Sequence, residues 1–496
     1  MHYILGVDIG TSACKVAAFD ECGTTCASST IPYKVFYPKP GYAEQSADDW
    51  YSAFCIGCSE IISAGINPAE IACIGIDGQS WSAIPVDITG TPLCNTPIWF
   101  DTRAAEVCEE IRSTIGEKMF FDVCGNPLQP SYTTPKVLWY KQNLPDMYRR
   151  IHKVMQSNSY IVLKLTGKYS QDLSQGYGLH FFDIRNGCYS AEMCSAMGLD
   201  ISMFPETIYK CSDIVGCVNS EAAKLTGLLE GTPVIAGGLD AACGTLGSGV
   251  LYAGQTQEQG GTSGGMSICT DECITNELLI TSQHVVHGKW ILQGGTTGGG
   301  GALKWWNDNF GEYENSIVPK DMSVYKLYDD LAQKIPCGSD GLIMLPYMAG
   351  ERSPIWDAKA KGMYFGIDYT KTKGHFIRAL MEGVAFALKH NLQTDTRIKI
   401  DTLYATGGSA NSRLWTQIKA DVTGCRICVP TSDMGATLGV AMVAGVGIGM
   451  YRSFEEAVAK TITIKREHIP NPENNDIYEE NYRKYITLYP AVKALY

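Results

Sequence analysis

The feature that most restricts how this chain can fold is a strand–turn–strand pattern that occurs twice, about half a chain apart. The segment "GVDIGTSACKVAAFD" covers residues 6–20, and "QTQEQGGTSGGMSICTD" covers residues 255–271. Both carry Gly-Thr-Ser at the turn, and 251 residues separate Thr11 from Thr262. Coincidence is the alternative, because these are common residues. The matching strand–turn–strand context favours an internal duplication.

The length of the chain sets the expected number of domains. A single hydrophobic core stops growing near ~250–300 residues, and this chain has 496. Strand-like runs alternate with helix-like runs, which predicts α/β domains with largely parallel sheets. We therefore expect two domains, residues 1–248 and 249–496, without a low-complexity linker between them.

Two local patterns in the first half support this class. The run "DDWYSAFCIGCSEIISAG" predicts an amphipathic helix, with Ser46 as its N-cap and with Asp48 and Asp49 in its first turn. The next run, "IACIGIDG" (71–78), predicts a buried strand.

Charge and composition exclude several classes of partner. The net charge is −12 and there is no basic tract, which argues against nucleic acid. Nucleotides remain possible ligands, because Mg²⁺ and backbone amides can receive phosphates without a basic surface. No apolar run reaches the ~20 residues that span a bilayer, and the first ten residues lack the pattern of a signal peptide. We expect a cytoplasmic protein without a membrane partner.

The nineteen cysteines include two Cys-x-x-Cys pairs, Cys55/Cys58 and Cys425/Cys428. Four such thiolates could form a zinc site if folding brought them together. The first pair lies in the predicted helix, where cysteine serves as a small apolar residue. We favour packing, with reduced thiols as expected in the cytoplasm.

The two Gly-Thr-Ser turns have the composition of phosphate-binding loops. Glycines allow close approach of the backbone, successive N–H groups can converge on an anion, and hydroxyls can donate further bonds. The residues concerned are Gly10, Thr11 and Ser12 in the first turn and Gly260, Gly261, Thr262, Ser263, Gly264 and Gly265 in the second. Asp8 would repel a bare phosphate but becomes favourable with Mg²⁺ between them. Lys15 is either a second cation or a solvated residue.

Two further glycine clusters lie in the second half. "LYATGGSANSRLWTQ" (403–417) ends a strand and begins a helix, an arrangement that favours phosphate or flat aromatic ligands. "LQGGTTGGGGALKWW" (292–306) follows an apolar strand, so its backbone is expected to pass close to a ligand. A flexible loop is the alternative for the latter. The candidate nucleotide contacts in these clusters are Gly300, Gly407, Gly408 and Asn411.

A single carboxylate, Asp240, stands in the small-residue segment "VIAGGLDAACG" (234–244). On residue type alone, it could cap the next helix in the chain.

These motifs together resemble the FGGY family of carbohydrate kinases, over nearly the whole chain. "GVDIGTSACKVAAFD" is similar to the family's first phosphate loop, and "SYTTPKVLWYKQN" (131–143) to its first signature, with Lys136 and Trp139 in place. "KGMYFGIDYTKTKGHFIRALMEGVAFAL" resembles the second signature, and "LPYMAGERSP" and "ATGGSANSRLWTQIKAD" resemble motifs on the nucleotide side. The resemblance implies two ribonuclease H-like α/β domains of the actin and heat-shock chaperone superfold around a central cleft. It also implies an N-terminal sugar-binding domain and a C-terminal nucleotide-binding domain.

The resemblance also implies a mechanism. Asp240 matches the catalytic aspartate, which would accept a proton from a sugar hydroxyl while that oxygen attacks the γ-phosphate of ATP in line. Asp8 and Asp240 would be the Mg²⁺ residues. The implied sugar contacts are Gln79, Trp81, Asp101, Arg103 and Asn126. Each has a structural alternative: an ion pair for Asp101 and Arg103, a core aromatic for Trp81, and turn residues for the two amides.

Within the family the likeness is greatest to the xylulokinases, on "IGIDGQSW" and "PIWFDTRA". Xylulokinases typically have Met-His after Gly-Gln, where this chain has Ser80-Trp81, and Asn after the catalytic Asp, where it has Ala241. Loss of one polar partner can change discrimination by ~10²-fold or more. The implied acceptor is a ketopentose, xylulose first, with gluconate, ribulose, L-xylulose, erythritol and glycerol left open.

Two interpretations from other classes also stay open at this point. A nucleotide-switched binding protein of the actin or chaperone sort would share the two phosphate turns, and an inert sugar sensor would lack the catalytic carboxylates. The family often forms dimers, so a homodimer remains an expectation without a decisive interface in the sequence.

Overall fold

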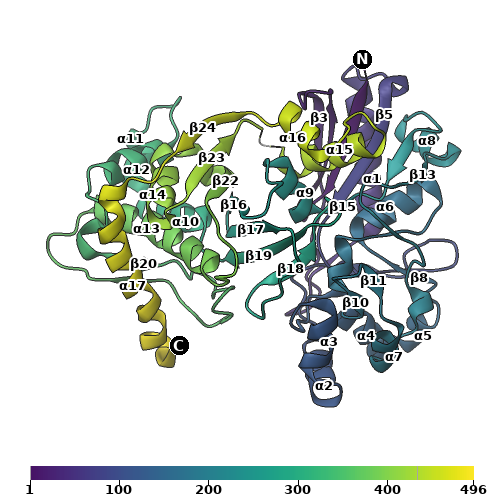
Figure 1. The fold of residues 1–496 in the computed structure, drawn as a ribbon, viewed down its shortest axis with the longest axis horizontal. Coiled ribbons are helices and arrows are strands. Elements are labelled where there is room, and N and C mark those ends of the chain that lie inside the picture. Colours follow the sequence, from purple (N-terminus) through teal and green to yellow (C-terminus); the bar gives the residue numbers. More distant parts are fainter. Residues whose placement is uncertain (1, 433) are drawn as a thin grey trace. The chain divides into compact units, whose positions relative to one another are not determined.

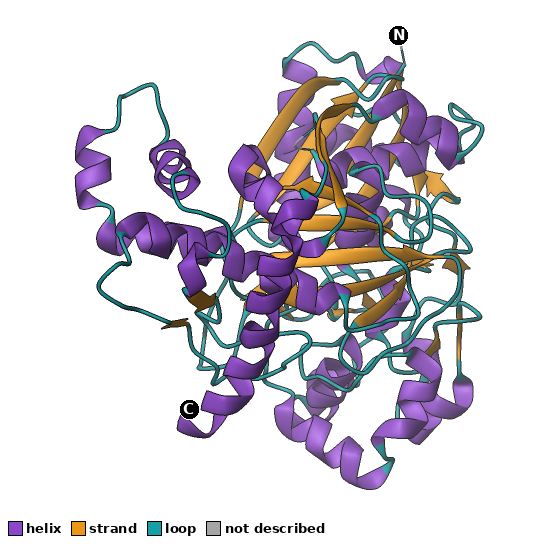
Figure 2. Ribbon diagram, turned by 60° about the vertical axis from the view of Figure 1, so that its left-hand side comes forward, coloured by secondary structure: helices purple, strands orange, loops and turns teal. Residues whose placement is uncertain are grey.

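A computed structural model describes residues 2–432 and 434–496 of the chain. The chain divides into two compact units. The first unit contains Met1–Leu251, Thr270–Ile291 and Met434–Ile462, and the second contains Tyr252–Cys269, Leu292–Asp433 and Thr463–Tyr496. Both units mix helices with strands (Figures 1 and 2), as the alternating sequence pattern predicts for the α/β class.

The first unit is built around a sheet, with helices on both of its faces. Its helices are α1 (Ala47–Ser63), α2 (Ala105–Thr114), α3 (Glu117–Cys124), α4 (Thr133–Asn143), α5 (Pro145–Tyr148), α6 (Ser157–Thr166), α7 (Ala191–Ala196), α8 (Ser220–Thr226), α9 (Asp240–Gly247), α15 (Gly435–Gly447) and α16 (Phe454–Thr461). Its strands are β1 (Tyr3–Ile9), β2 (Ala13–Phe19), β3 (Thr25–Pro32), β4 (Glu44–Gln45), β5 (Ile71–Gly78), β6 (Ile84–Val86), β7 (Thr96–Pro97), β8 (Lys153–Met155), β9 (Gln171–Asp172), β10 (Phe182–Asp183), β11 (Cys188–Tyr189), β12 (Ile208–Tyr209), β13 (Ile214–Cys217), β14 (Pro233–Ile235), β15 (Gly238–Leu239) and β18 (Ile280–Gln283).

The second unit has fewer and longer elements. Its helices are α10 (Gly300–Phe310), α11 (Glu312–Ile317), α12 (Val324–Gln333), α13 (Lys373–Leu392), α14 (Arg413–Thr423) and α17 (Asn475–Val492). Its strands are β16 (Gln255–Gly260), β17 (Gly264–Thr270), β19 (Trp290–Thr296), β20 (Ile343–Leu345), β21 (Met363–Phe365), β22 (Thr402–Thr406), β23 (Arg426–Pro430) and β24 (Ile464–His468).

The central sheet of the first unit is buried on both faces. Its strands follow the order β13-β14-β5-β1-β2-β3, and β15 also pairs with β5. Alternate residues of β1, β2 and β5 pack against α1 and α6 on one face and against α9 and α15 on the other. This double covering explains why "IACIGIDG" is a continuous run of small and apolar residues rather than an alternating one.

The internal duplication predicted from the two turns is confirmed by the strand order. In the second unit the strands follow β19-β17-β16-β22-β23-β24, which matches β3-β2-β1-β5-β14-β13 in the first. Each series pairs an antiparallel hairpin with a parallel strand (β1 with β5, β16 with β22) and ends on an antiparallel strand. The turns of the two hairpins, residues 10–12 and 261–263, each contain three residues.

The division of the chain differs from a single boundary at residue 248. The first segment of the first unit ends close to that point, at Leu251, but two later segments belong to the same unit. The second of them carries α15, which packs on α9, β1 and β5. This packing requires glycine: a Cβ on Gly439 would lie 1.8 Å from the carbonyl oxygen of Cys243, and one on Gly247 would lie 1.9 Å from that of Gly435. The small residues of α15 therefore complete the first unit.

Two local expectations are met. Ser46 caps α1 by accepting a hydrogen bond from the backbone N–H of Asp49. All nineteen cysteines are free thiols, and Cys58 is buried within α1, as expected for a packing residue. Within the described part of the chain, no helix combines the length and the apolar character needed to cross a bilayer.

The contact between α9 and α15 makes a testable prediction. Gly439→Ala should lower the free energy of unfolding by about 2–3 kcal/mol or more, because the new methyl group would overlap a backbone carbonyl that cannot rotate away. Gly435→Ala is the matched control in the same helix, since its Cβ would meet the carbonyl oxygen of Gly244 at an ordinary 3.8 Å. Urea denaturation of both variants gives the measurement. Equal stability of the two would contradict this account of the helix contact.

Candidate active site

One row of charged side chains crosses the sheet of the first unit. Asp8 on β1 is opposite Lys15 on β2 and opposite Asp77 on β5. All three side chains share the face that α15 covers, because Gly6 and Gly75, two residues before the two aspartates, lie against the backbone of α15. The row therefore results directly from the pairing register of three strands.

The carboxyl groups of Asp8 and Asp77 are buried, and few positive charges or hydrogen-bond donors offset the cost of that burial. The Nζ of Lys15 lies 3.5 Å from Oδ2 of Asp8, and the Lys15 side chain is half exposed. Burial raises the pKa of Asp8, although Lys15 opposes the effect. Burial, with the nearby charges of Asp8 and Asp240, raises the pKa of Asp77 well above its usual range. Neither oxygen of Asp77 receives a hydrogen bond from a described donor, so a proton or a cation is needed to stabilise it.

Asp240 is placed beside this row by β15. Gly238 and Leu239 pair with Asp77 and Gly78, and Asp240 follows at once as the first residue of α9. Its Oδ1 accepts a 2.6 Å hydrogen bond from the N–H of the next residue. A helix-capping carboxylate would accept from the second or third N–H of the helix, so the capping interpretation is not supported. Burial, and then the charge of Asp8, raise the pKa of Asp240 to about 7.

Side chains of neighbouring residues fix the first Gly-Thr-Ser turn by donating hydrogen bonds to its carbonyl oxygens. The carbonyl oxygen of Gly10 accepts from the Tyr33 hydroxyl, and that of Thr11 accepts from Nε2 of Gln45 at 2.8 Å. The Trp99 indole donates to the Thr11 hydroxyl oxygen at 2.9 Å, which leaves the hydroxyl proton able to donate elsewhere. A Cβ on Gly10 would lie 3.4 Å from the Asp8 carboxylate, so the turn passes directly over that group.

Gln79 is connected to this turn through one residue that sequence reasoning did not select. Its Nε2 donates to Oε1 of Gln45 at 2.8 Å, and Gln45 donates in turn to Thr11. Gln79 is buried, and its Oε1 receives no hydrogen bond from a described residue. A buried acceptor without a donor requires an explanation, and a ligand hydroxyl group is one.

Trp81 has an unusual backbone conformation for a large residue. Its φ is +58°, and its indole stacks on Tyr132 with ring centroids 4.1 Å apart. The buried Nζ of Lys136 donates to the carbonyl oxygens of Trp81, at 2.9 Å, and of Ile98, at 2.8 Å. Burial lowers the pKa of Lys136 to about 7. Positive φ in a bulky residue is costly and is typical of functional sites.

Asp101 and Arg103 form a buried ion pair, the structural alternative that their spacing left open. Nε and an Nη of Arg103 both bond to the Asp101 carboxylate, at 2.8–3.0 Å. The same guanidinium bonds to Glu44 at 2.7 Å and lies over the rings of Tyr42 and Trp139. Glu44 precedes Gln45 in β4, so this short strand connects the ion pair to Gln79.

Asn126 has a different position from the other predicted sugar contacts. Its Nδ2 donates to the carbonyl oxygens of Cys124 and Thr281, and its Oδ1 accepts from the N–H of Thr281. Both ends of the amide thus fasten a loop to β18. These contacts favour a structural role for Asn126.

The three glycine segments of the second unit come together at one place. The N–H of Gly300 donates to the carbonyl oxygen of Gly261 at 2.7 Å, and the N–H of Gly301 donates to that of Thr262 at 2.9 Å. Gly407 has φ +81°, and a Cβ there would lie 2.9 Å from the carbonyl carbon of Gly260. The second Gly-Thr-Ser turn is therefore wedged between the other two segments, with no room for a side chain at Gly300 or Gly407.

A cavity of about 720 Å³ opens at this junction. Its lining includes five of the predicted nucleotide contacts: Gly261, Thr262, Gly300, Gly408 and Asn411. Ser263 and Gly407 are not among the lining residues. The wall that sequence reasoning missed comes from α10, α12 and α14 and consists of Leu303, Lys304, Ser323, Tyr325, Lys326, Asp329, Ser409, Ser412 and Trp415. Glycine backbone on one side and aromatic rings with two lysines on the other suit a nucleotide.

Comparison with known proteins identifies the family of both halves of the chain. The model of the FGGY family of carbohydrate kinases, N-terminal domain, matches residues 3–247, and that of the C-terminal domain matches residues 259–448. A xylulose kinase of Staphylococcus epidermidis is 30% identical over 99% of this chain and 97% of its own length. A gluconokinase of Bacillus licheniformis is 26% identical over 100% of this chain and 97% of its own.

Solved structures give the same result. The crystal structure of xylulose kinase from Rhodospirillum rubrum superposes with a TM-score of 0.91 at 25% identity, covering 100% of this chain and 99% of that one. With both domain models matched in order and relatives aligned along the full length, this chain belongs to the FGGY family of carbohydrate kinases.

Proposed function

We propose that the protein phosphorylates xylulose to xylulose 5-phosphate with ATP, and that Asp240 is the general base. The observation that carries the proposal is the place of Asp240, at the start of α9 and beside the Asp8–Asp77 row. The xylulose kinases among the relatives support the choice of acceptor. A nucleotide-driven switch is less favoured, since it has no use for a base beside a polar site.

Asp240 activates the acceptor by taking its proton. A base works best when its pKa lies near the working pH, and the pKa of Asp240 is raised to about 7. The hydroxyl oxygen then attacks the terminal phosphorus of ATP, the bond to the bridging oxygen breaks, and ADP leaves. The N–H and hydroxyl groups of the Gly10–Ser12 turn would hold the transferred phosphoryl group.

The residues of the carboxylate row fit Mg²⁺. The donor set is oxygen only, and Asp77 has two buried oxygens without a donor, so a cation at the row would stabilise the ionised form of these carboxyls. Among the described residues no three His, Cys, Asp or Glu side chains enclose a metal by themselves. Mg²⁺ commonly uses one or two carboxylates with phosphate oxygens and water. Asp8 and Asp240 would hold the ion, which when bound neutralises phosphate charge.

The nucleoside end of ATP is assigned to the cavity of the second unit. Its volume of about 720 Å³ suits a nucleotide. Tyr325 and Trp415 supply rings for the base, and the wedged glycine turns supply backbone N–H groups for phosphates.

The acceptor is assigned to the polar cluster around Gln79. The unpaired Oε1 of Gln79 and the unpaired buried Nε1–H of Trp81 offer one acceptor and one donor to a polyol. Tyr177 donates to the Ser80 hydroxyl oxygen at 2.7 Å, which leaves the Ser80 hydroxyl proton as a further donor. Discrimination between ketopentoses, polyols and sugar acids follows from such single hydrogen bonds.

The proposal is tested by coupled measurement of ADP release with a panel of acceptors. D-Xylulose should give the highest kcat/KM, above L-xylulose, ribulose, gluconate, erythritol and glycerol. Faster turnover of gluconate or another member of the panel would change the assigned acceptor, but the assignment of kinase activity would stand. ATP hydrolysis that no sugar stimulates would overturn the proposal.

Asp240→Asn should lower kcat by about 10²–10⁴-fold, the loss expected when a general base is removed. The amide keeps the shape of the side chain, so the affinity for ADP, measured by calorimetry, should stay within about twofold. Turnover close to that of the wild type would contradict the role of Asp240.

The stability of the metal-free protein should depend on pH through the same residue. The pKa of Asp240 is raised from 3.8 to about 7 by folding, so between these values the folded state holds a proton that the unfolded state has lost. Stability from this group is therefore present at low pH and is lost as the pH rises towards 7. At about pH 8, in EDTA, Asp240→Asn should be more stable than the wild type by about 1–3 kcal/mol. The difference should vanish near pH 4; denaturant titrations at several pH values measure it.

Gln79→Ala should raise the KM for the sugar by about 10–100-fold and leave the KM for ATP unchanged. Asn126→Ala is the matched control: its contacts are all to backbone, so it should lower the melting temperature without a selective effect on the sugar. If Asn126→Ala raised the sugar KM and Gln79→Ala did not, the assignment of the acceptor cluster would be wrong.

A further inference from the structure

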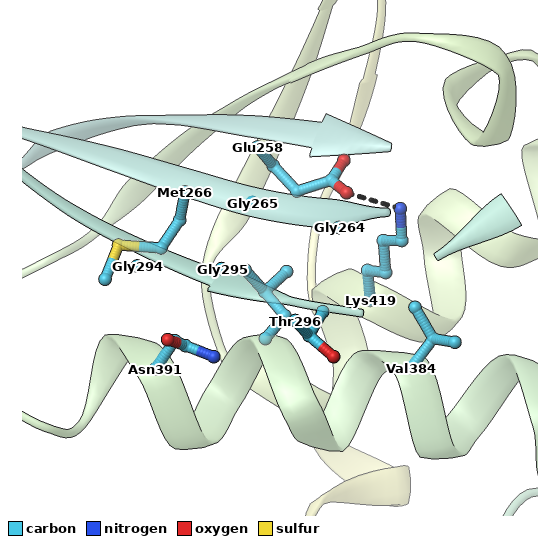
Figure 3. A pocket seen from close by; sticks show the side chains of 11 residues that line it. Glu258, Gly264, Gly265, Met266, Gly294, Gly295, Thr296, Val384, Asn391 and Lys419 are labelled. Carbon is cyan, nitrogen blue, oxygen red and sulfur yellow. Dashed lines mark hydrogen bonds and ion pairs between the residues drawn. The ribbon is translucent and has the colours of Figure 1, made fainter. Parts of the chain in front are cut away.

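A buried ion pair lies directly beneath the second Gly-Thr-Ser turn. Nζ of Lys419, on α14, is 2.6 Å from Oε1 of Glu258, on β16, and both side chains are almost completely buried (2% and 4% exposed). The same Nζ donates to the Ser409 hydroxyl at 2.7 Å. Figure 3 shows Lys419 and Glu258 reaching towards each other beside the ends of the glycine-rich strands.

Each contact of this network leads to the nucleotide cavity. Ser409 lines that cavity, and its Oγ would lie only 1.7 Å from a Cβ on Gly260. Glu258 is two residues before Gly260, the last residue of β16 ahead of the turn. Lys419 is on the helix whose N-cap, Ser412, is also in the cavity wall. The ion pair thus joins the two stretches of sequence around residues 258–262 and 408–419, which both contribute to the wall.

The surroundings of the pair are closed. A small cavity of about 10 Å³ lies against Glu258 and Lys419, between the glycines of β17 and β19 and the helix α13 (Figure 3). Its lining includes Glu258 and Asn391, whose Oε2 and Oδ1 are buried acceptors that no described donor serves. This space matches one water molecule.

A buried ion pair is a weak source of stability, because desolvation of the two charges offsets their attraction. Its advantage lies in geometry, because charge-assisted hydrogen bonds restrict the relative positions of the groups that they join more than apolar contacts do. We propose that Glu258 and Lys419 are positioning residues for nucleotide binding, which hold Ser409 and the Gly261–Ser263 turn in the geometry that receives ATP. This inference rests on the nucleotide site assigned under the proposed function.

The test replaces both charges with apolar groups of similar length, Glu258→Met with Lys419→Met, so that neither charge is left unpaired. The Kd for ADP, measured by calorimetry, should rise by roughly tenfold to a hundredfold, the range expected when binding groups are misplaced by about 1 Å. The KM for ATP should rise with it, while the KM for the sugar stays within about twofold. A purely structural role would not separate the two substrates in this way.

A control ion pair exists in the same unit, with one buried partner and one that is 42% exposed. Lys389 on α13 forms an ion pair with Glu479 on α17, and neither residue lines the two cavities. Lys389→Met with Glu479→Met should leave the Kd for ADP within about twofold of the wild type. Equal loss of ADP affinity in both double variants would mean a general effect on the unit and would overturn the inference.

Ser409→Ala tests the link itself and leaves the ion pair in place. Alone it should weaken ADP binding, and on the Glu258→Met, Lys419→Met background it should add little, because the two changes break one network. Wild-type affinity for ADP in either the double variant or Ser409→Ala would overturn the inference. So would a triple variant whose loss of ADP affinity equals the product of the two separate losses. If the double variant does not fold, Ser409→Ala still decides. Failure of the wild-type protein to bind ADP would instead overturn the proposed function.

Discussion

The pairing of β1 with its two neighbours is the constraint on which the rest of the first unit depends. It places Asp8 between Lys15 and Asp77 on one face of the sheet, and β15 then brings Asp240 to the end of the same row. A one-residue slip would turn Asp8 to the opposite face, among the apolar residues packed on α1. The apolar residues of both faces fix this register, so the hydrophobic core and the reactive carboxylates are set by the same strand pairing.

The two units use one topology for different purposes. In the first, the hairpin turn passes over an acidic row, and the amide of Gln79 and the indole of Trp81, the proposed acceptor contacts, lie in the nearby loops. In the second, the equivalent turn is wedged between two other glycine segments and borders a cavity of about 720 Å³. The duplication supplies the framework, and the two units differ in the residues that follow the equivalent parallel strands: Gln79 to Trp81 after β5, and Gly407 to Asn411 after β22.

The sequence predicted those parts of the site whose residues form short patterns along the chain. The two turns, Asp8 and the two-domain α/β class follow from residue types at fixed spacing, and Asp240 followed from the family resemblance. Asp77 was missed because a single aspartate in an apolar strand acquires meaning only from its partner across the sheet, 69 residues earlier in the chain. Glu258 and Lys419 were missed for the same reason, since 161 residues separate them. Asn126 shows the opposite case: a polar residue in a matching segment whose bonds all go to backbone.

The return of α15 to the first unit has a consequence for how the protein is made. The ribosome releases the chain from its N-terminus, so β1 and β5 are available long before residues 435–447 emerge. Until then, one face of the sheet lacks most of its cover, and Gly6 and Gly75 have no helix backbone to pack against. The second unit, or most of it, is synthesised in this interval. The first unit, although translated first, is therefore completed only after most of the second unit has been made, and its exposed face is where a chaperone would be needed during translation.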